Sequence, residues 1–318
     1  MTTLRPPATS SRSANWFVID ARLLALIACP DCHGTMDDES LQLRCRDCAH
    51  TYPIVDGIPL LLRNSAAGSL KESQAAFFDE ETDPEFEARR PHGTPRFYRL
   101  LIEEKFERST EQIQGLLPGS TALTVCGGSG MDAEFLARAG AFAISSDISL
   151  GATRRAVDRA RRFDLDLVGI VADVEHLPFR DRSVDVVYVH DGLHHLAQPM
   201  LGLDEMARVA GRAVSVTEPA RALATAAAVR VGLALDREES GNEVMRLTPA
   251  EVSAHLVEAG FDVVAARRYA MLYRHEPGRI SRLFSAPGLL GLSRGALRAT
   301  NAVLGGLGNK LTVQGIRT

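Results

Sequence analysis

The sequence predicts an α/β protein in which a doubly wound, mostly parallel sheet follows a small cysteine-rich module. From residue 121 onward, apolar runs of β type alternate with runs of helical spacing, which is typical of parallel strands with helices on both faces. A glycine-rich turn follows the first of these runs, where such sheets bind ligands. Four of the five cysteines lie ahead of this region, within residues 16–63.

Length and composition limit the classes of function that the chain can have. A chain of 318 residues suits about two domains, and 45% hydrophobic residues suffice for a buried core. The net charge of -4 predicts no general attraction to nucleic acid or anionic lipid. No run of 18 apolar residues occurs, so we expect no membrane span.

The N-terminal region also bears on localisation. Leu23–Ala28 before Cys29 resembles a lipoprotein cleavage box. This run is shorter than the apolar region of about 7–15 residues that a secretory signal needs, and Asp20 and Arg22 directly precede it. We therefore expect a cytoplasmic protein, whose reduced thiols serve a metal or chemistry.

Changes in composition divide the chain into five segments. Residues 1–15 are rich in Thr, Ser, Pro and Arg and are predicted to be disordered. The cysteine module spans 16–63, a helical connector 64–110, and the α/β core 111–275. The tail, 276–318, contains several glycines that argue against one rigid helix. It is a possible lid over an apolar substrate or a membrane contact, or it simply packs on the core.

Within the core, five strands are expected, with helices at about 131–139 and 150–162 between the first of them. A later helix should begin after Thr248, with Pro249 in its first turn, and run to 259. A last strand is expected at 262–267. The five strands are predicted at Ala122–Cys126, Ala141–Ser146, Leu167–Ala172, Val184–His190 and Ala213–Glu218.

The four cysteines of the module form two C-x-x-C pairs separated by twelve residues: Cys29, Cys32, Cys45 and Cys48. Each pair can form a tight knuckle that offers two thiolates to one tetrahedral Zn²⁺. Gly34 is expected to supply a left-handed turn in the first knuckle. With four thiolates, no position remains open for water, so the zinc would be structural. Buried or redox-active cysteines are the alternative.

The segment 24–62 includes the run Tyr-Pro-Ile-Val-Asp-Gly-Ile-Pro-Leu-Leu from Tyr52. With the cysteines, it resembles the small zinc-ribbon protein that activates several tRNA and release-factor methyltransferases. The resemblance implies a structural zinc and a packing role, here fused to the partner domain. His33 and His50 lie near the site and are expected to be surface residues.

The glycine-rich turn reads Cys126-Gly127-Gly128-Ser129-Gly130. Its glycines permit a tight turn and close approach of the backbone to a ligand. Asp147 lies 19 residues after Gly128, at the end of the next predicted strand, and suits a carboxylate that accepts ribose hydroxyls. These features alone fit either NAD or S-adenosylmethionine (SAM).

A third motif favours SAM. The run Ala172–Phe179 followed by Asp181–Val187 resembles the D-x-x-x-L-P-F … D-x-S-F-D-V-V segment of class I SAM-dependent methyltransferases, which include ubiquinone and menaquinone biosynthesis enzymes. The resemblance covers about residues 115–220. It implies that Asp173 holds the adenine amino group, and it assigns the following residues to the cofactor site: Cys126, Gly127, Gly128, Gly130, Asp147, Asp173 and Val174.

Two positions depart from the family pattern. Thr124 stands where the family has an acidic residue that supports the loop and the methionine end of SAM, and Asp132 is the candidate to replace it. Cys126 stands where the first glycine is expected. We interpret Cys126 as a small turn residue, with a nucleophile as the alternative.

The fourth predicted strand ends in His190-Asp191-Gly192-Leu193-His194-His195. In this fold, ligands bind outside the carboxyl ends of the strands. Methyl transfer mainly requires positioning, and a hydroxyl acceptor also benefits from a base. His194, His195 and His190 are the candidate bases, although a histidine here could also cap a helix beside SAM. Glu218 is a candidate for substrate contact.

These observations favour SAM-dependent methyl transfer to a small organic molecule, such as a secondary metabolite, quinone or sugar, with an oxygen acceptor favoured over carbon or nitrogen. A methyltransferase acting on RNA or protein and a non-catalytic SAM-fold module remain alternatives. The oligomeric state is left open. An arginine cluster is interpreted as a solvated helix face, with phosphate binding as the alternative: Arg154, Arg155, Arg159, Arg161 and Arg162.

Overall fold

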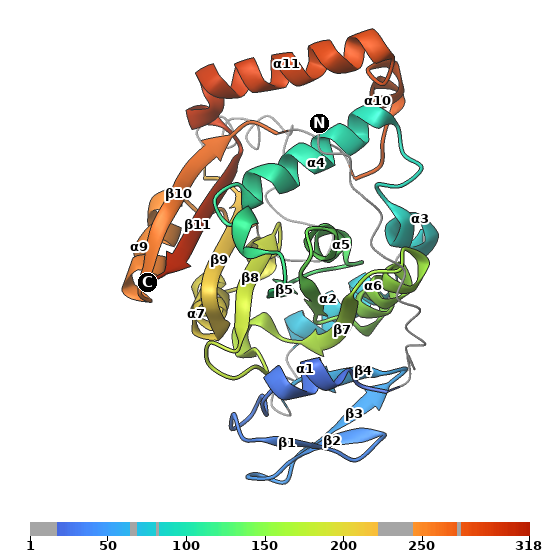
Figure 1. The fold of residues 1–318 in the computed structure, drawn as a ribbon, viewed down its shortest axis with the longest axis vertical. Coiled ribbons are helices and arrows are strands. Elements are labelled where there is room, and N and C mark those ends of the chain that lie inside the picture. Colours follow the sequence, from blue (N-terminus) through green and yellow to red (C-terminus); the bar gives the residue numbers. More distant parts are fainter. Residues whose placement is uncertain (1–17, 64–68, 81–82, 222–243, 272–274) are drawn as a thin grey trace.

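The computed structural model describes residues 18–63, 69–80, 83–221, 244–271 and 275–318. The disorder expected for residues 1–15 lies outside these ranges. The described strands form one eleven-stranded sheet of order β1-β2-β3-β4-β7-β6-β5-β8-β9-β11-β10 (Figure 1). The predicted α/β class, with a mostly parallel core preceded by a ribbon, is confirmed. No helix in the described ranges is both long and apolar enough to cross a bilayer.

The parallel centre of the sheet follows the predicted pattern. Its order is β7-β6-β5-β8-β9, and neighbouring strands within it pair in parallel. The first four strands agree with the prediction to within one residue at each end, and the fifth is longer. Their bounds are β5 Thr121–Val125, β6 Phe142–Asp147, β7 Leu167–Ala172, β8 Val184–His190 and β9 Ala210–Pro219.

Helices cover both faces of these strands. On one face, Phe106, Leu136 and Ala160 share a core with the inner strands. On the other, Met206 and Leu256 join a second core. The helices that carry these residues are α4 Arg96–Thr110, α5 Met131–Arg138, α6 Leu150–Arg162, α7 Pro199–Val209 and α9 Pro249–Glu258. The last of these begins with a capping box between Thr248 and Glu251, as its first residues suggest.

The strands of the ribbon continue the main sheet. Its last strand pairs in parallel with β7 through Leu60 and Leu61. Its first helix also packs on the core, since Leu23 and Ile27 share a buried cluster with Phe179. The ribbon elements are α1 Ala21–Leu26, β1 Met36–Asp38, β2 Gln42–Cys45, β3 Thr51–Val55 and β4 Ile58–Leu61.

The connector is helical, as expected, and its helices are α2 Ser69–Asp79, α3 Pro84–Arg89 and α4. Asp83 caps α3 by accepting a hydrogen bond from the backbone N–H of Phe86. Both α2 and α3 lie against α6. The connector therefore wraps the end of the sheet where the parallel strands finish.

The C-terminal segment differs from the expected tail. After β10 Phe261–Tyr269, the chain forms α10 Arg279–Leu283 and α11 Pro287–Leu304, and then returns as β11 Lys310–Arg317. Strand β11 lies between β9 and β10 and is antiparallel to both. The core therefore continues to the end of the chain, beyond residue 275.

Helix α11 also differs from the expectation that glycines exclude a single helix here. Each glycine costs about 1 kcal/mol against alanine, but tertiary contacts offset this cost. Asn301 accepts a hydrogen bond from the backbone N–H of Ala270 and donates to the carbonyl of the same residue. Arg294 and Arg298 pair with Glu104 of α4, which holds the helix along the outer edge of the molecule (Figure 1).

Candidate functional site

A cavity of about 510 Å³ opens where the parallel strands end. This position agrees with the rule that such sheets bind ligands at their carboxyl edge. Six of the seven residues predicted for the cofactor line it: Cys126, Gly127, Gly128, Asp147, Asp173 and Val174. Gly130, the seventh, has a φ of 76° and allows the loop to pack on α6, since a Cβ there would lie 2.7 Å from the Cβ of Ala156.

The glycine loop is held closely against the next strand. The N–H of Gly127 donates to the carbonyl of Ser146 over 2.8 Å. A Cβ on Gly127 would lie 2.6 Å from Oγ of Ser145, so no larger residue fits there. The hydroxyl of Thr124 turns into the sheet and donates to Ile144. The position where the family has an acid therefore presents no carboxylate here.

Asp147 is buried and oriented by two backbone donors. Its Oδ2 accepts from the N–H of Gly128 at 2.9 Å, and its Oδ1 accepts from the N–H of Ser149 at 3.0 Å. Burial raises the pKa of Asp147 above its ordinary value, although these donors oppose the shift. The carboxylate thus links the glycine loop to the start of α6 while lining the cavity.

Asp173 forms an ion pair that the sequence did not suggest. The ammonium group of Lys71, from α2, contacts the carboxylates of both Asp173 and Glu175. Lys71 itself lines the cavity. A single lysine on a connector helix carries no motif, so only the tertiary fold could reveal this contact.

Side-chain contacts hold helix α2 beside the cavity. Gln74 donates to the backbone carbonyl of His195 at 2.9 Å, and the ring of Phe78 meets the His195 ring edge-on. At the end of the helix, Asp79 accepts hydrogen bonds from Ser149 and Gly151 at the start of α6. The connector therefore supplies one wall of the site.

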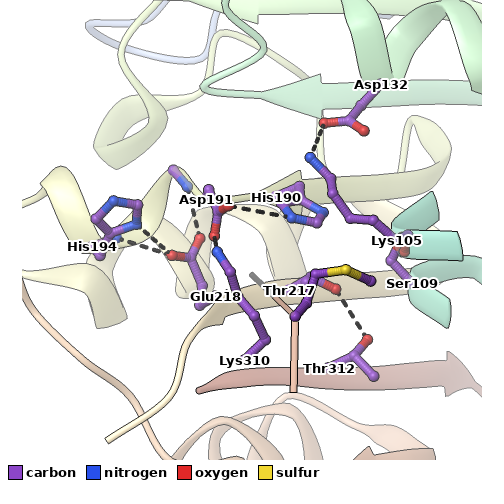
Figure 2. Close-up of polar contacts among 12 residues, drawn as sticks. Lys105, Ser109, Asp132, His190, Asp191, His194, Thr217, Glu218, Lys310 and Thr312 are labelled. Carbon is purple, nitrogen blue, oxygen red and sulfur yellow. Dashed lines mark hydrogen bonds and ion pairs between the residues drawn. The ribbon is translucent and has the colours of Figure 1, made fainter. Parts of the chain in front are cut away.

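The three predicted histidines separate into two environments. His190 and His195 line the cavity. His194 is buried against Glu218, with 2.8 Å between Nδ1 and a carboxylate oxygen (Figure 2). Glu218 also accepts the backbone N–H groups of Gly192 and Leu193. Glu218 and His194 thus hold the turn after β8 in place.

His190 is the histidine best placed to act on a bound molecule. Its side chain is fully buried, and its Nε2 lies 3.4 Å from Oδ2 of Asp191 (Figure 2). Burial and the nearby charge of Lys105 lower the pKa of His190, so the ring is neutral near neutral pH. A neutral imidazole at the wall of a cavity can accept a proton.

Charged side chains surround His190 at this end of the cavity (Figure 2). The buried ammonium group of Lys105 lies 3.7 Å from Asp132, the residue expected to replace the missing loop acid. Lys310 pairs with Asp191. Burial alone would raise the pKa of Asp191, but Lys310 and His190 hold it well below its ordinary value. This end of the cavity is therefore polar, and its two lysines are each paired with an aspartate.

The arginine cluster is not a uniformly solvated face, and for Arg159 that interpretation is wrong. Arg159 is fully buried because its guanidinium binds carboxylate and carbonyl groups on several elements. It donates to the carbonyl of Ser129 at 2.8 Å and to Glu134 at 2.8 Å. Arg155 lines the cavity, whereas Arg154 pairs with Asp56 on the surface. Arg159 thus supports the glycine loop from beneath.

The four ribbon cysteines converge as predicted, with their sulfur atoms all within 4.8 Å of one another. The Cys29–Cys48 and Cys32–Cys45 sulfur pairs are 3.6 and 3.4 Å apart. A tetrahedral site with Zn–S bonds of about 2.3 Å needs sulfur atoms about 3.8 Å apart. The donor set therefore fits a structural zinc ion.

In the cysteine knuckles, the left-handed backbone conformation does not fall on Gly34, as predicted, but on other residues. The left-handed residues are His33, with a φ of 58°, and Ala49, with a φ of 60°. Gly34 is required for a different reason, because a Cβ there would lie 2.2 Å from Oδ2 of Asp47 and 2.9 Å from Sγ of Cys45. His33 and His50 are exposed, as expected.

Comparisons with known proteins agree with this architecture. Residues 123–216 match the family model for a methyltransferase domain, and residues 20–57 match that for Trm112p-like protein. Demethylmenaquinone methyltransferase from Corynebacterium urealyticum is 36% identical over 104 residues, covering 33% of this chain and 43% of that protein. The one from Renibacterium salmoninarum is 35% identical over 116 residues, covering 36% and 44%.

The chain thus spans less than half the length of these relatives. Among solved structures, magnesium protoporphyrin IX methyltransferase (ChlM) from Synechocystis, with bound SAH, aligns with a TM-score of 0.54 at 15% identity, covering 79% of this chain and 100% of that one. This similarity concerns the fold alone. The protein therefore has a class I methyltransferase fold, in which residues 123–216 match the methyltransferase-domain model, and a four-cysteine ribbon at its N-terminal side that matches the Trm112p-like model.

Proposed function

We propose that the protein is a SAM-dependent methyltransferase that acts on a small organic molecule through a hydroxyl oxygen. The observation that carries this proposal is a single cavity with two kinds of wall. The glycine loop, Asp147 and Asp173 line one part, and His190 and Lys105 line another. A volume of about 510 Å³ is in the range of small-molecule sites.

The cofactor would occupy the wall formed by the glycine loop. Asp147 would accept the ribose hydroxyls, and Asp173 and Val174 would bind the adenine. When bound, SAM would supply an electrophilic methyl group on its sulfonium: the acceptor oxygen would bond to the methyl carbon in line with the breaking S–C bond, and S-adenosylhomocysteine would leave as the thioether. Because such a displacement needs mainly alignment, the protein's task is to hold the acceptor oxygen and remove its proton.

We assign the proton transfer to His190 rather than to its neighbours. It lines the cavity, and its lowered pKa keeps it unprotonated near neutral pH. His194 is a positioning residue, since its Nδ1 is engaged by Glu218. Gln74 and Phe78 of α2 contact His195, so we assign His195 a role in shaping the wall of the cavity.

The acceptor class follows from the lining and from the relatives. Met271 and Leu196 add apolar surface to the polar groups around His190. The curated relatives bear the name demethylmenaquinone methyltransferase. We therefore favour a hydroxylated aromatic or quinol-type acceptor over RNA or a protein.

The test is transfer of a labelled methyl group from SAM to a panel of quinols, phenols and sugars. We expect transfer to a quinol or phenol, and His190→Gln should lower kcat by about 100-fold, as removal of a general base does. Because the pKa of His190 lies below its ordinary value, the wild-type rate should stay constant around neutral pH and fall only in more acidic solution. His195→Gln is the matched control and should affect KM more than kcat. Full kcat in His190→Gln would exclude His190 as the base.

A further inference from the structure

The segment between β10 and β11 returns to the cavity at both of its ends. Met271 and His275 line the cavity before the segment, and Asn309 and Lys310 line it afterward. Between them lie α10 and α11, which we call the insert. The insert therefore stands at the acceptor end of the site, beside Lys310 and Asp191.

Helix α11 has two unlike faces. Its inner face packs on α4 through Leu297, and Asn301 bonds to Ala270. At 100° per residue, its outer face is apolar along its centre, with Thr300 at the margin. Leu292 and Val303 on this face are 72% and 81% exposed. The outer positions are Gly288, Leu289, Leu292, Gly295, Ala296, Ala299, Ala302 and Val303.

The apolar exposure continues around this helix. Ile280 and Leu283 of α10 are 69% and 64% exposed, and Leu307 after α11 is 70% exposed. Among the described residues, half of the exposed large apolar side chains lie between Ile280 and Leu307. Such a concentrated patch marks an interaction surface.

Charge identifies the partner. From Pro277 to Thr318 the chain contains no Asp or Glu, although its overall charge is -4. The same stretch contains six basic residues, of which Arg294 and Arg298 pair with Glu104 of α4 and Lys310 pairs with Asp191; the others are Arg279, Arg282 and Arg317. Arg279 and Arg282 are exposed and flank Ile280 and Leu283. Exposed apolar side chains bordered by arginine are typical of a helix that lies on an anionic membrane surface.

We propose that the insert docks the protein onto an anionic phospholipid bilayer, with the outer face of α11 against the acyl chains. A second copy of the chain is a poorer partner, because a symmetric contact would bring the exposed Arg279 and Arg282 of the two copies together. The net charge of the whole chain does not reveal this end, because the acidic residues all precede Pro277. If the proposed function also holds, docking would place the acceptor end of the cavity beside membrane-dissolved substrates.

The test is co-sedimentation of the full chain with vesicles, either of phosphatidylcholine alone or with about one third phosphatidylglycerol. We expect binding to the anionic vesicles that weakens as salt is raised. Placing Asp at both Leu292 and Val303 (Leu292→Asp with Val303→Asp) should reduce binding at least about tenfold, because two apolar contacts become charged. Leu41→Asp is the matched control, since Leu41 is 80% exposed on the ribbon at the opposite end of the molecule (Figure 1).

Two results would overturn the proposal: no binding of the wild type to anionic vesicles, or equal binding by the double variant. A dimer in sedimentation analysis that the double variant dissociates would instead identify a second copy as the partner. Circular dichroism and S-adenosylhomocysteine titration of each variant check the fold. These measurements require no methyl transfer, so failure of docking and failure of the proposed function are separable.

Discussion

Cys126 stands in a backbone conformation that suits glycine. Its φ is 50°, and the family loop has glycine at this position. A side chain in this left-handed region costs about 1 kcal/mol or more. Burial and the nearby carboxylate of Asp147 raise the pKa of the Cys126 thiol well above its ordinary value. Cys126 is thus a turn residue in a strained conformation, and its thiol stays protonated near neutral pH.

The strain at Cys126 can be measured by comparing two truncations. Both Cys126→Ala and Cys126→Gly remove the thiol, but only glycine adopts this φ without cost. We expect the Gly variant to be more stable than the Ala variant by about 1 kcal/mol in urea unfolding. Equal stabilities, or a more stable Ala variant, would show that the loop relaxes around the side chain.

Arg159 illustrates a residue whose role depends on burial. Its guanidinium is fully buried against Glu134 and the carbonyl of Ser129. Arg159→Ala should lower the free energy of unfolding by about 3–5 kcal/mol, because Glu134 and several carbonyls lose a buried partner. Arg154→Ala, at an exposed ion pair with Asp56, should cost less than about 1 kcal/mol. Similar losses in both variants would contradict this assignment.

At the residue scale, the sequence predicted those site positions that carry a motif. The cysteine spacing, Asp147 at a strand end, and the Asp173 motif all lead to residues that the fold brings together. Lys71, Lys105 and Arg159 carry no such signal, since an isolated basic residue on a helix is usually solvated. Only the packing of α2, α4 and α6 against the sheet determines what these side chains touch.

At the element scale, the pairing of β4 with β7 connects the ribbon to the cofactor wall. Leu61 pairs with Ala172, and Asp173 follows directly. Arg63, just after β4, lies 3.2 Å from Nδ1 of His176 in the next turn. Strand β7 ends at Ala172, directly before Asp173. Displacement of the ribbon, which pairs with β7, would therefore disturb the turn that carries Asp173.

Removing a zinc ligand tests this connection. Cys29→Ser should release zinc and lower the melting temperature of the ribbon, because one of four converging thiolates is lost. We also expect weaker S-adenosylhomocysteine binding by about tenfold, as is typical of coupled sites. Cys126→Ser, outside the ribbon, should retain zinc. Unchanged zinc content by metal analysis would refute the site, and unchanged affinity would refute the coupling.

The sequence did not predict the strand and the long helix at the C-terminal side, β11 and α11. The parallel strands are continuous apolar runs because both faces are covered, and such runs are recognisable. Strand β11 pairs between β9 and β10, and no local pattern reveals that a segment after a long insertion returns to the sheet. The glycines of α11 predict a broken helix, but its contacts with α4 and Ala270 outweigh their propensity.

At the scale of the whole molecule, the sheet runs from the ribbon at one end to β10 and β11 at the other (Figure 1). The net charge of -4 hides an uneven distribution, since the last 42 residues carry no acid. The cavity lies between these regions: the ribbon pairs with β7, which leads to the proposed cofactor wall, and the insert is rooted at the proposed acceptor end. Binding of SAM in this cavity is the claim on which the proposed activity depends.

The most direct test is calorimetric titration of the protein with S-adenosylhomocysteine, SAM and NAD. The account predicts that S-adenosylhomocysteine and SAM bind and that NAD does not. Asp147→Ala should weaken binding by about 1–3 kcal/mol, since the ribose hydroxyls lose a buried partner. Asp181→Ala, at an exposed carboxylate, should bind like the wild type. Absence of S-adenosylhomocysteine and SAM binding at millimolar concentration, or binding of NAD instead, would contradict the account.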